Sequence, residues 1–182
     1  MRRKNPGFSL IEILVVIAII GIIAAIALPG AINFVKGYKL HANASAVAAQ
    51  INVTRFRATS QYRPYRLSIN STAGRTVRER LTTGYGSPET EETIPLDQGI
   101  RFLTACPVSA KPGTIPSSLT ASSTAVYFNT RGLPVDTSGA PTNSNVFYLA
   151  NDNNLYDAVT VSLGGKVTIY NYSTVTSTWT AR

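Results

Sequence analysis

The sequence begins MRRKNPGFSLIEILVVIAIIGIIAAIALPG (residues 1–30), and this stretch decides the fold. Within residues 8–28 only Ser9 and Glu12 are neither apolar nor glycine. As a helix this run is about 32 Å long at roughly 1.5 Å per residue, which is enough to cross a hydrocarbon core of about 30 Å. We therefore expect a membrane-spanning helix, with the cations at residues 2–4 keeping its N-terminal end in the cytoplasm.

Two simple interpretations of this segment leave one residue unexplained. A cleaved secretory signal peptide would need a small-residue cleavage site, which Ala25-Ile26-Ala27 imitates, although the apolar run exceeds the usual length of about 7 to 15 residues. A plain uncleaved anchor needs no such site. Neither explains Glu12, because a carboxylate in the middle of a bilayer costs on the order of 2 to 3 kcal/mol.

A third interpretation uses the whole of KNPGFSLIEILVVIAIIGIIAAIALP (residues 4–29), which resembles the N-terminus of a type IV prepilin or a type II secretion pseudopilin. In those proteins a prepilin peptidase cuts after a glycine, leaves the apolar helix in place and methylates the new amine. The resemblance implies cleavage between Gly7 and Phe8, N-methylation of Phe8, and subunit assembly through Glu12. Pro29, followed by glycine, is the expected helix kink.

The spacing of Phe8 and Glu12 gives this assignment a physical basis. The two residues lie one helical turn apart on the same face, so a cationic amine and a carboxylate would share one side of the helix. The resemblance implies that the amine partner of Glu12 comes from a neighbouring subunit. The alternative is an interfacial Glu12 that lipid headgroups solvate.

Apolar residues continue at helical spacing beyond Pro29, so we expect one helix from Phe8 to about Thr59. Strands are expected after Pro64, in segments rich in β-branched and aromatic residues. These segments are Tyr65–Asn70, Thr76–Leu81, Ile100–Thr104, Ala125–Asn129, Val146–Ala150, Tyr156–Leu163 and Lys166–Tyr172. Residues 82–98, 106–124 and 130–145 are expected to be loops, and Gly164-Gly165 is expected to form a two-residue hairpin turn.

A second resemblance lies in the globular part. VYFNTRGLPVDTSG (126–139) and AVTVSLGGKVTIY (158–170) are similar to the C-terminal half of the GspH/FimT pseudopilin domain, and residues 43–70 are similar to its helix-to-strand junction. The implied fold is α+β: a pilin fold, in which a long N-terminal helix packs on an antiparallel β-sheet domain. The expected organisation is leader 1–7, transmembrane helix 8–28, amphipathic helix 29–60 and β-rich domain 61–182.

The implied function is that of a minor pseudopilin of a type II secretion system, which assembles into or primes a periplasmic pseudopilus. The alternative is a minor pilin of a type IV pilus. The implied partners are other pilin or pseudopilin subunits, met through the N-terminal helix, together with the prepilin peptidase and an inner-membrane assembly platform. The expected location is the cytoplasmic membrane, with the domain in the periplasm or outside, and then the filament.

An arginine-rich segment raises the question of nucleic-acid binding, because such a patch with interleaved tyrosines can bind phosphates and stack bases. Some FimT-type minor pilins bind DNA in natural transformation through a basic C-terminal hairpin, where this chain has Gly164-Gly165-Lys166. The simpler interpretation is a solvated charged surface opposed within the segment by Glu79 alone. The candidate DNA or partner contacts are Arg55, Arg57, Arg63, Arg66, Arg75, Arg78, Arg80 and Lys166.

Catalysis is not expected. The chain has one histidine, His41, on the expected helix, and one cysteine, Cys106, in an expected loop. A Cys/His pair or a metal cluster cannot be assembled from these with any recognised spacing, so no catalytic residue, metal or cofactor is assigned. The formal net charge of +8 falls by three if the leader is removed. The mature chain is therefore only moderately basic.

Overall fold

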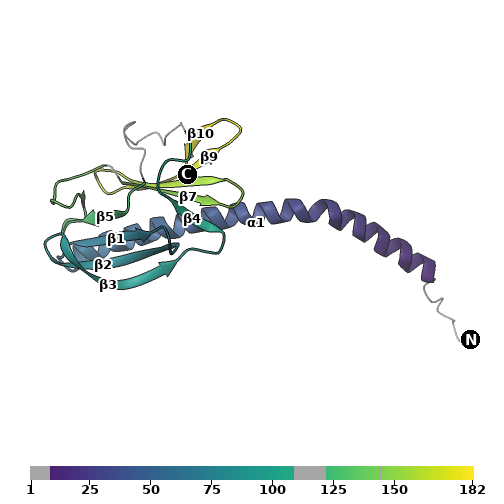
Figure 1. Ribbon diagram of the computed structural model, residues 1–182, viewed down its shortest axis with the longest axis horizontal. Coiled ribbons are helices and arrows are strands. Elements are labelled where there is room, and N and C mark those ends of the chain that lie inside the picture. Colours follow the sequence, from purple (N-terminus) through teal and green to yellow (C-terminus); the bar gives the residue numbers. More distant parts are fainter. Residues whose placement is uncertain (1–8, 109–121, 144) are drawn as a thin grey trace, which may run out of the picture. The chain divides into compact units, whose positions relative to one another are not determined.

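The computed structural model describes residues 9–108, 122–143 and 145–182. One helix, α1 (Leu10–Ser60), precedes ten strands in these residues (Figure 1). The chain divides into two compact units, Met1–Val35 and Lys36–Arg182. The strands are β1 (Tyr65–Asn70), β2 (Arg75–Thr83), β3 (Gly86–Pro95), β4 (Ile100–Leu103), β5 (Ala125–Phe128), β6 (Pro134–Val135), β7 (Asn145–Asn151), β8 (Tyr156–Val161), β9 (Val167–Ser173) and β10 (Thr178–Ala181).

The end of α1 is a defined capping motif. Tyr62 adopts a left-handed conformation with φ of 52°, and the Arg63 amide donates to the Ala58 carbonyl at 3.3 Å. This is the Schellman arrangement that closes many helices, here with tyrosine at the position that glycine usually occupies. Pro64 follows and cannot continue the helix.

The strands form two antiparallel sheets of five strands each. One sheet, which we call sheet A, has the order β3-β2-β1-β5-β6, and the other, sheet B, has the order β10-β9-β8-β7-β4. In sheet A, Leu67 of β1 lies opposite Arg78 of β2 and Val126 of β5. The predicted α+β fold, a long helix against antiparallel strands, is confirmed.

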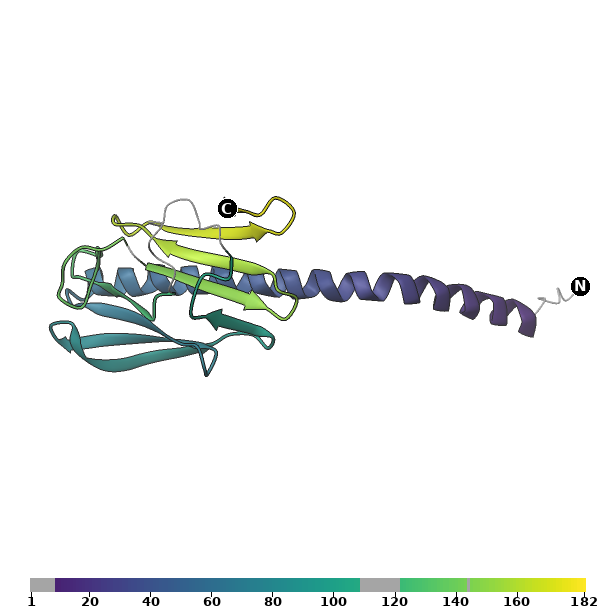
Figure 2. The ribbon, with the colours of Figure 1, turned by 45° about the horizontal axis from the view of Figure 1, so that its top comes forward.

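The core of the second unit lies between α1 and both sheets (Figure 2). Leu40, Val47 and Ile51 of α1 are fully or almost fully buried, and Phe128 of sheet A and Phe147 of sheet B join the same cluster. Alanines between the larger helical side chains have little volume, so the helix can approach the sheets closely. The apolar spacing in the sequence therefore marks the face that packs.

The seven predicted strands are present with small changes at their ends, but three further strands were missed. β3 lies inside the predicted loop 82–98, β6 lies inside the predicted loop 130–145, and β10 follows the last predicted strand. β3 has the sequence GSPETEETIP, whose composition is typical of a loop, and its pairing with β2 overrides that preference. Most of the predicted loop 106–124 lies outside the described residues.

The β8–β9 hairpin forms at the predicted glycine pair, but its turn is longer than expected. Ser162 donates its amide to Lys166, and Gly165 donates its amide to Ser162, so three residues form the loop. Gly165 has φ of +76°, the left-handed conformation typical of the bulge residue in a three-residue hairpin. The two-residue prediction was wrong because the sequence did not reveal which glycine takes positive φ.

Candidate functional site

The predicted cleavage and methylation residues, Gly7 and Phe8, lie outside the described residues. Glu12 is exposed in the first turn of α1, where its amide donates to the Ser9 carbonyl at 3.1 Å. Ser9 and Glu12 have the Ser-x-x-Glu spacing of a capping box, and a carboxylate in the first turn interacts favourably with the helix dipole. The sequence reasoning did not use this spacing, although it is visible in the sequence.

The first unit presents apolar side chains without a covering partner in the isolated chain. Leu10, Ile17 and Ile26 are exposed, as are the other large apolar side chains between residues 10 and 35. This part of α1 is long and apolar enough to cross a membrane by length and composition. α1 continues through Pro29, whose side chain is not described, so a kink there stays a prediction.

The arginine-rich segment is not opposed by Glu79 alone, because β3 adds three glutamates beside β2. Arg80 pairs with Glu89, and Arg78 pairs with Glu92. The sequence analysis placed these glutamates in a loop and therefore overestimated the uncompensated positive charge. The strand pairing of β2 and β3 brings the two charge types together.

Arg78 is the centre of a polar network that joins β2, β3 and α1. Its side chain is almost fully buried, and it donates to Gln50 of α1 at 2.9 Å besides contacting Glu92. A register shift at Arg78 makes Glu91 an extra residue on β3, and its carboxylate lies 3.8 Å from Arg78. Neighbouring strand residues normally face opposite sides, so this β-bulge lets both Glu91 and Glu92 reach one guanidinium.

Glu91 also binds Tyr65 at the edge of this network. The Tyr65 hydroxyl donates to Glu91 at 2.5 Å and lies 2.8 Å from Gln61, which directly follows α1. Burial, together with the carboxylate of Glu91, raises the pKa of Tyr65 to about 12. The phenol is therefore held in its neutral form and links β1 to β3.

Arg66 lies on the other face of sheet A. It forms a two-bond pair with Glu79, at 2.6 and 3.1 Å, and its guanidinium lies over the Tyr127 ring at 5.8 Å from the ring centre. The hydrogen bond to Glu79 raises the pKa of Arg66. Three of the seven candidate arginines, Arg66, Arg78 and Arg80, are thus held in ion pairs.

The remaining candidates are not brought together into one paired cluster. Arg55 donates to the Gly165 carbonyl at 3.0 Å, which ties α1 to the β8–β9 hairpin beside Lys166. Lys166 is exposed in that hairpin. Exposed positions are also occupied by Arg57, Arg63 and Arg75. A role for any of these residues in binding DNA or a partner stays a prediction.

The single histidine and the single cysteine have separate environments. His41 donates Nδ1–H to the buried carboxylate of Asp157 at 2.6 Å, and the Cys106 thiol contacts the Val108 carbonyl at 3.2 Å. Within residues 9–108, 122–143 and 145–182, no three His, Cys, Asp or Glu side chains gather in a group that could hold a metal ion. Sequence reasoning missed Asp157, which lies within β8, because nothing near it in the sequence indicates that it binds a residue of the helix.

Comparisons with known proteins agree with the N-terminal chemistry and with the fold. Residues 2–28 match the prokaryotic N-terminal methylation motif. The chain is 41% identical over 73 residues to the type II secretion system protein H of Xanthomonas campestris pv. campestris, a match covering 38% of this chain and 41% of that relative. The chain thus spans about two fifths of the length of the curated relative it matches.

Among solved structures, the minor pseudopilin EpsH from the type II secretion system of Vibrio cholerae has a similar fold. The TM-score is 0.50 with 10% sequence identity, and the match covers 73% of this chain and 97% of that chain. An identity this low supports the fold alone. The chain thus combines a match to the N-terminal methylation motif, an apolar N-terminal helix and an α+β fold similar to that of EpsH, a combination that resembles proteins of the prepilin class.

The curated relative and the solved structure are both subunits of type II secretion systems. The chain resembles the minor pseudopilins of type II secretion, and the curated relative it matches is protein H. The apolar helix and the methylation motif fit anchoring in the inner membrane.

Proposed function

We propose that this chain is a minor pseudopilin of a type II secretion system, inserted in the inner membrane with its β-rich domain in the periplasm. The observation that carries the proposal is the 41% identity to protein H over 73 residues. The methylation motif over residues 2–28 and the EpsH-like fold support it. The role is structural: the subunit enters or primes a short periplasmic filament.

The N-terminal residues have defined tasks in this proposal. The prepilin peptidase cleaves between Gly7 and Phe8 and methylates the Phe8 amine. Glu12 then receives the amine of a neighbouring subunit while residues 10–35, whose large apolar side chains are exposed, pack against the helices of other subunits. Packing of this kind removes an apolar surface from contact with lipid or water as the subunit leaves the bilayer. The assembly platform in the membrane and the peptidase are the further partners.

The capping-box position of Glu12 suggests a sharp experiment. Glu12→Gln keeps a hydrogen-bonding side chain at the third position of the first turn, which suits a capping box, but removes the carboxylate that would pair with a neighbouring amine. We expect Glu12→Gln to be produced and processed normally yet to lose filament incorporation and complementation of a deletion strain. Ser9→Ala is the matched control, because it weakens only the local cap. Normal incorporation of the Glu12→Gln subunit would refute the assigned role of Glu12.

The alternative of a DNA-binding type IV minor pilin receives no support from the comparisons. The relatives found are type II secretion subunits. In addition, β3 places three glutamates against the arginine-rich strand β2. The geometry therefore favours the secretion role over nucleic-acid binding.

A further inference from the structure

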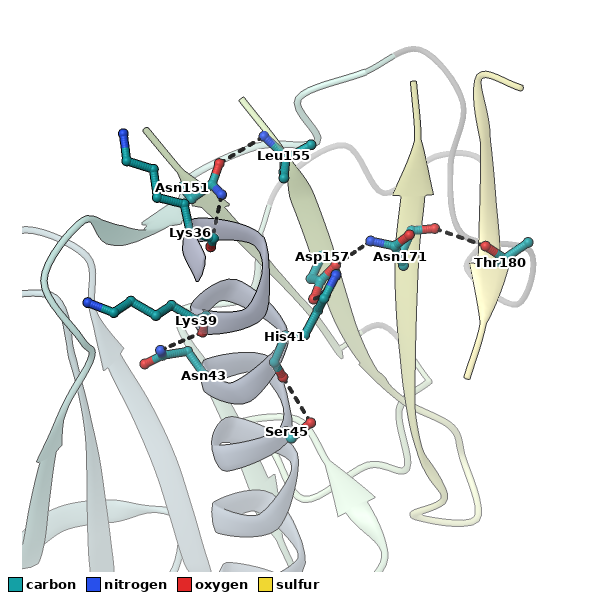
Figure 3. Close-up of polar contacts among 10 residues, drawn as sticks. All are labelled: Lys36, Lys39, His41, Asn43, Ser45, Asn151, Leu155, Asp157, Asn171 and Thr180. Atoms are coloured by element: carbon teal, nitrogen blue, oxygen red, sulfur yellow. Dashed lines mark hydrogen bonds and ion pairs between the residues drawn. The ribbon is translucent and has the colours of Figure 1, made fainter. Parts of the chain in front are cut away.

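The second unit begins at Lys36, and this residue of α1 has a polar contact with sheet B (Figure 3). Asn151, at the end of β7, donates its side-chain amide to the Lys36 carbonyl at 3.2 Å. The oxygen of the same side chain accepts the amides of Asn153 and Leu155 at 3.0 Å each, which fixes the β7–β8 turn. Gly37 leaves room beside α1 for the Leu155 side chain. This turn is therefore shaped to contact the helix.

The next contact links the helix to two strands. The Asp157 carboxylate of β8 is almost completely buried, and its two oxygens are bound separately: His41 donates to one at 2.6 Å and Asn171 of β9 donates to the other at 2.9 Å. His41 is the residue of α1 that binds Asp157, and its side chain is 28% exposed. A buried carboxylate without its partners carries a large desolvation cost. Separating His41 from the sheet is therefore costly.

A third contact joins the same part of α1 to the segment before β4. Asn43 donates to the Asp97 carboxylate at 3.0 Å and accepts the Asp97 backbone amide at 3.0 Å. Between residues 36 and 46 the helix buries only one large apolar side chain, Leu40. Polar contacts therefore supply much of the specific attachment at this end of the domain. We call the contacts of Lys36, His41 and Asn43 the base contacts.

We propose that the base contacts act as a mechanical stop, which prevents α1 from peeling off sheet B when load is applied along its N-terminal half. The inference rests on the proposed function, in which residues 10–35 leave the bilayer while the domain stays attached. The three contacts lie within about two turns of one helix and end on the β7–β8 turn, on β8 with β9, and on the segment before β4. A load on the helix is consequently shared among several parts of the domain.

Two alanines on the buried face of α1 provide matched reporters of local opening. Ala44 lies next to the base contacts in sequence and Ala58 lies at the other end of the domain helix, and both are completely buried. Each is changed to cysteine, Ala44→Cys or Ala58→Cys, in a Cys106→Ser background. The rate of maleimide labelling is then measured on the full chain in detergent micelles, with and without His41→Ala. Asn43→Ala is the second variant, and His41→Gln is the conservative one.

The stop predicts local and not global opening. His41→Ala and Asn43→Ala should raise labelling at Ala44→Cys at least tenfold and change labelling at Ala58→Cys less than twofold, and His41→Gln should restore most of the protection. An equal rise at both reporters, or no rise at either, would overturn the proposal.

A cellular measurement separates this inference from the proposed function. Suppose that the wild-type chain enters filaments and that His41→Ala enters them equally well, although His41→Ala raises labelling at Ala44→Cys. The mechanical stop is then refuted, while the proposed function stands. If the stop is correct, His41→Ala is retained in the membrane at normal levels but incorporated poorly. If the wild-type chain itself fails to enter filaments, the proposed function fails, and the micelle reporters still decide whether the base contacts hold α1.

Discussion

Gly165→Ala should destabilise the domain, whereas the same change at the neighbouring Gly164 should not. Gly165 has φ of +76°, and an added Cβ would lie 2.9 Å from Arg55 Cζ and 3.0 Å from the Gly132 carbonyl oxygen. The left-handed conformation costs alanine about 1 to 2 kcal/mol. Overpacking against a backbone oxygen adds about 1 kcal/mol, and the reduced entropy of the unfolded chain returns about 0.4 to 1 kcal/mol. The expected net loss is about 2 kcal/mol.

This loss is measurable as a change in melting temperature. For a domain of this size, 1 kcal/mol corresponds to about 2 to 4 °C, so Gly165→Ala should lower Tm by about 4 to 8 °C. Gly164 has no atom within 4 Å of its added Cβ and no positive φ, so Gly164→Ala is the matched control and should leave Tm unchanged or slightly raised. Thermal melting of the full chain in detergent micelles, followed by circular dichroism, compares the two. Equal melting temperatures would refute the close packing of Gly165 against Arg55 and the Gly132 carbonyl.

Three further predictions concern the polar network around β3. Arg78→Ala should cost about 2 to 3 kcal/mol because it removes an almost fully buried guanidinium together with its hydrogen bonds to Gln50 and Glu92. Arg80→Ala, which removes a more exposed pair, should shift the melting temperature far less, and thermal melting compares the two variants. The pKa of Tyr65 is raised to about 12 in the folded chain, above its ordinary value of 10, so the stability from its neutral phenol is complete below pH 10 and is lost as pH rises toward 12. Tyr65→Phe should therefore show a smaller loss of stability over that pH range, and an unchanged alkaline profile would contradict this. Finally, the full chain should bind DNA weakly in a salt titration. Changing Glu89, Glu91 and Glu92 of β3 together to glutamine removes their negative charges and should increase the salt-dependent binding.

The sequence predicted the elements whose hydrophobic pattern matches their burial. The buried residues of α1 follow helical spacing, and Tyr65–Asn70 was predicted with both ends correct. β3 was missed because its side chains are almost all exposed and its composition contains Gly, Pro and Glu. Its position depends on pairing with β2 and on the charge match with Arg78 and Arg80, and neither pairing is visible in a local window of sequence.

In the candidate site, too, short-range features could be predicted from the sequence and long-range contacts could not. Residues 2–28 carry a short-range motif, so the expectation of methylation could be formed from adjacent residues alone. The base contacts join residues 54 to 116 positions apart, and His41 and Asp157 are the most distant pair. A lone histidine on a helix gives no indication of its partner, because that partner is selected by the packing of α1 against sheet B. The structure was needed to find it.

Our proposal that the chain is processed and assembled as a prepilin-class subunit is tested most directly by identifying its mature N-terminus. We would determine the intact mass and N-terminal sequence of the protein isolated from membranes of cells that contain a prepilin peptidase. We expect a chain that begins at Phe8 and carries one added methyl group. An intact Met1 would contradict this expectation, because no amine would then form at Phe8 for Glu12 of a neighbouring subunit to receive. A start at Leu28 would also contradict it, because Glu12 itself would then have been removed.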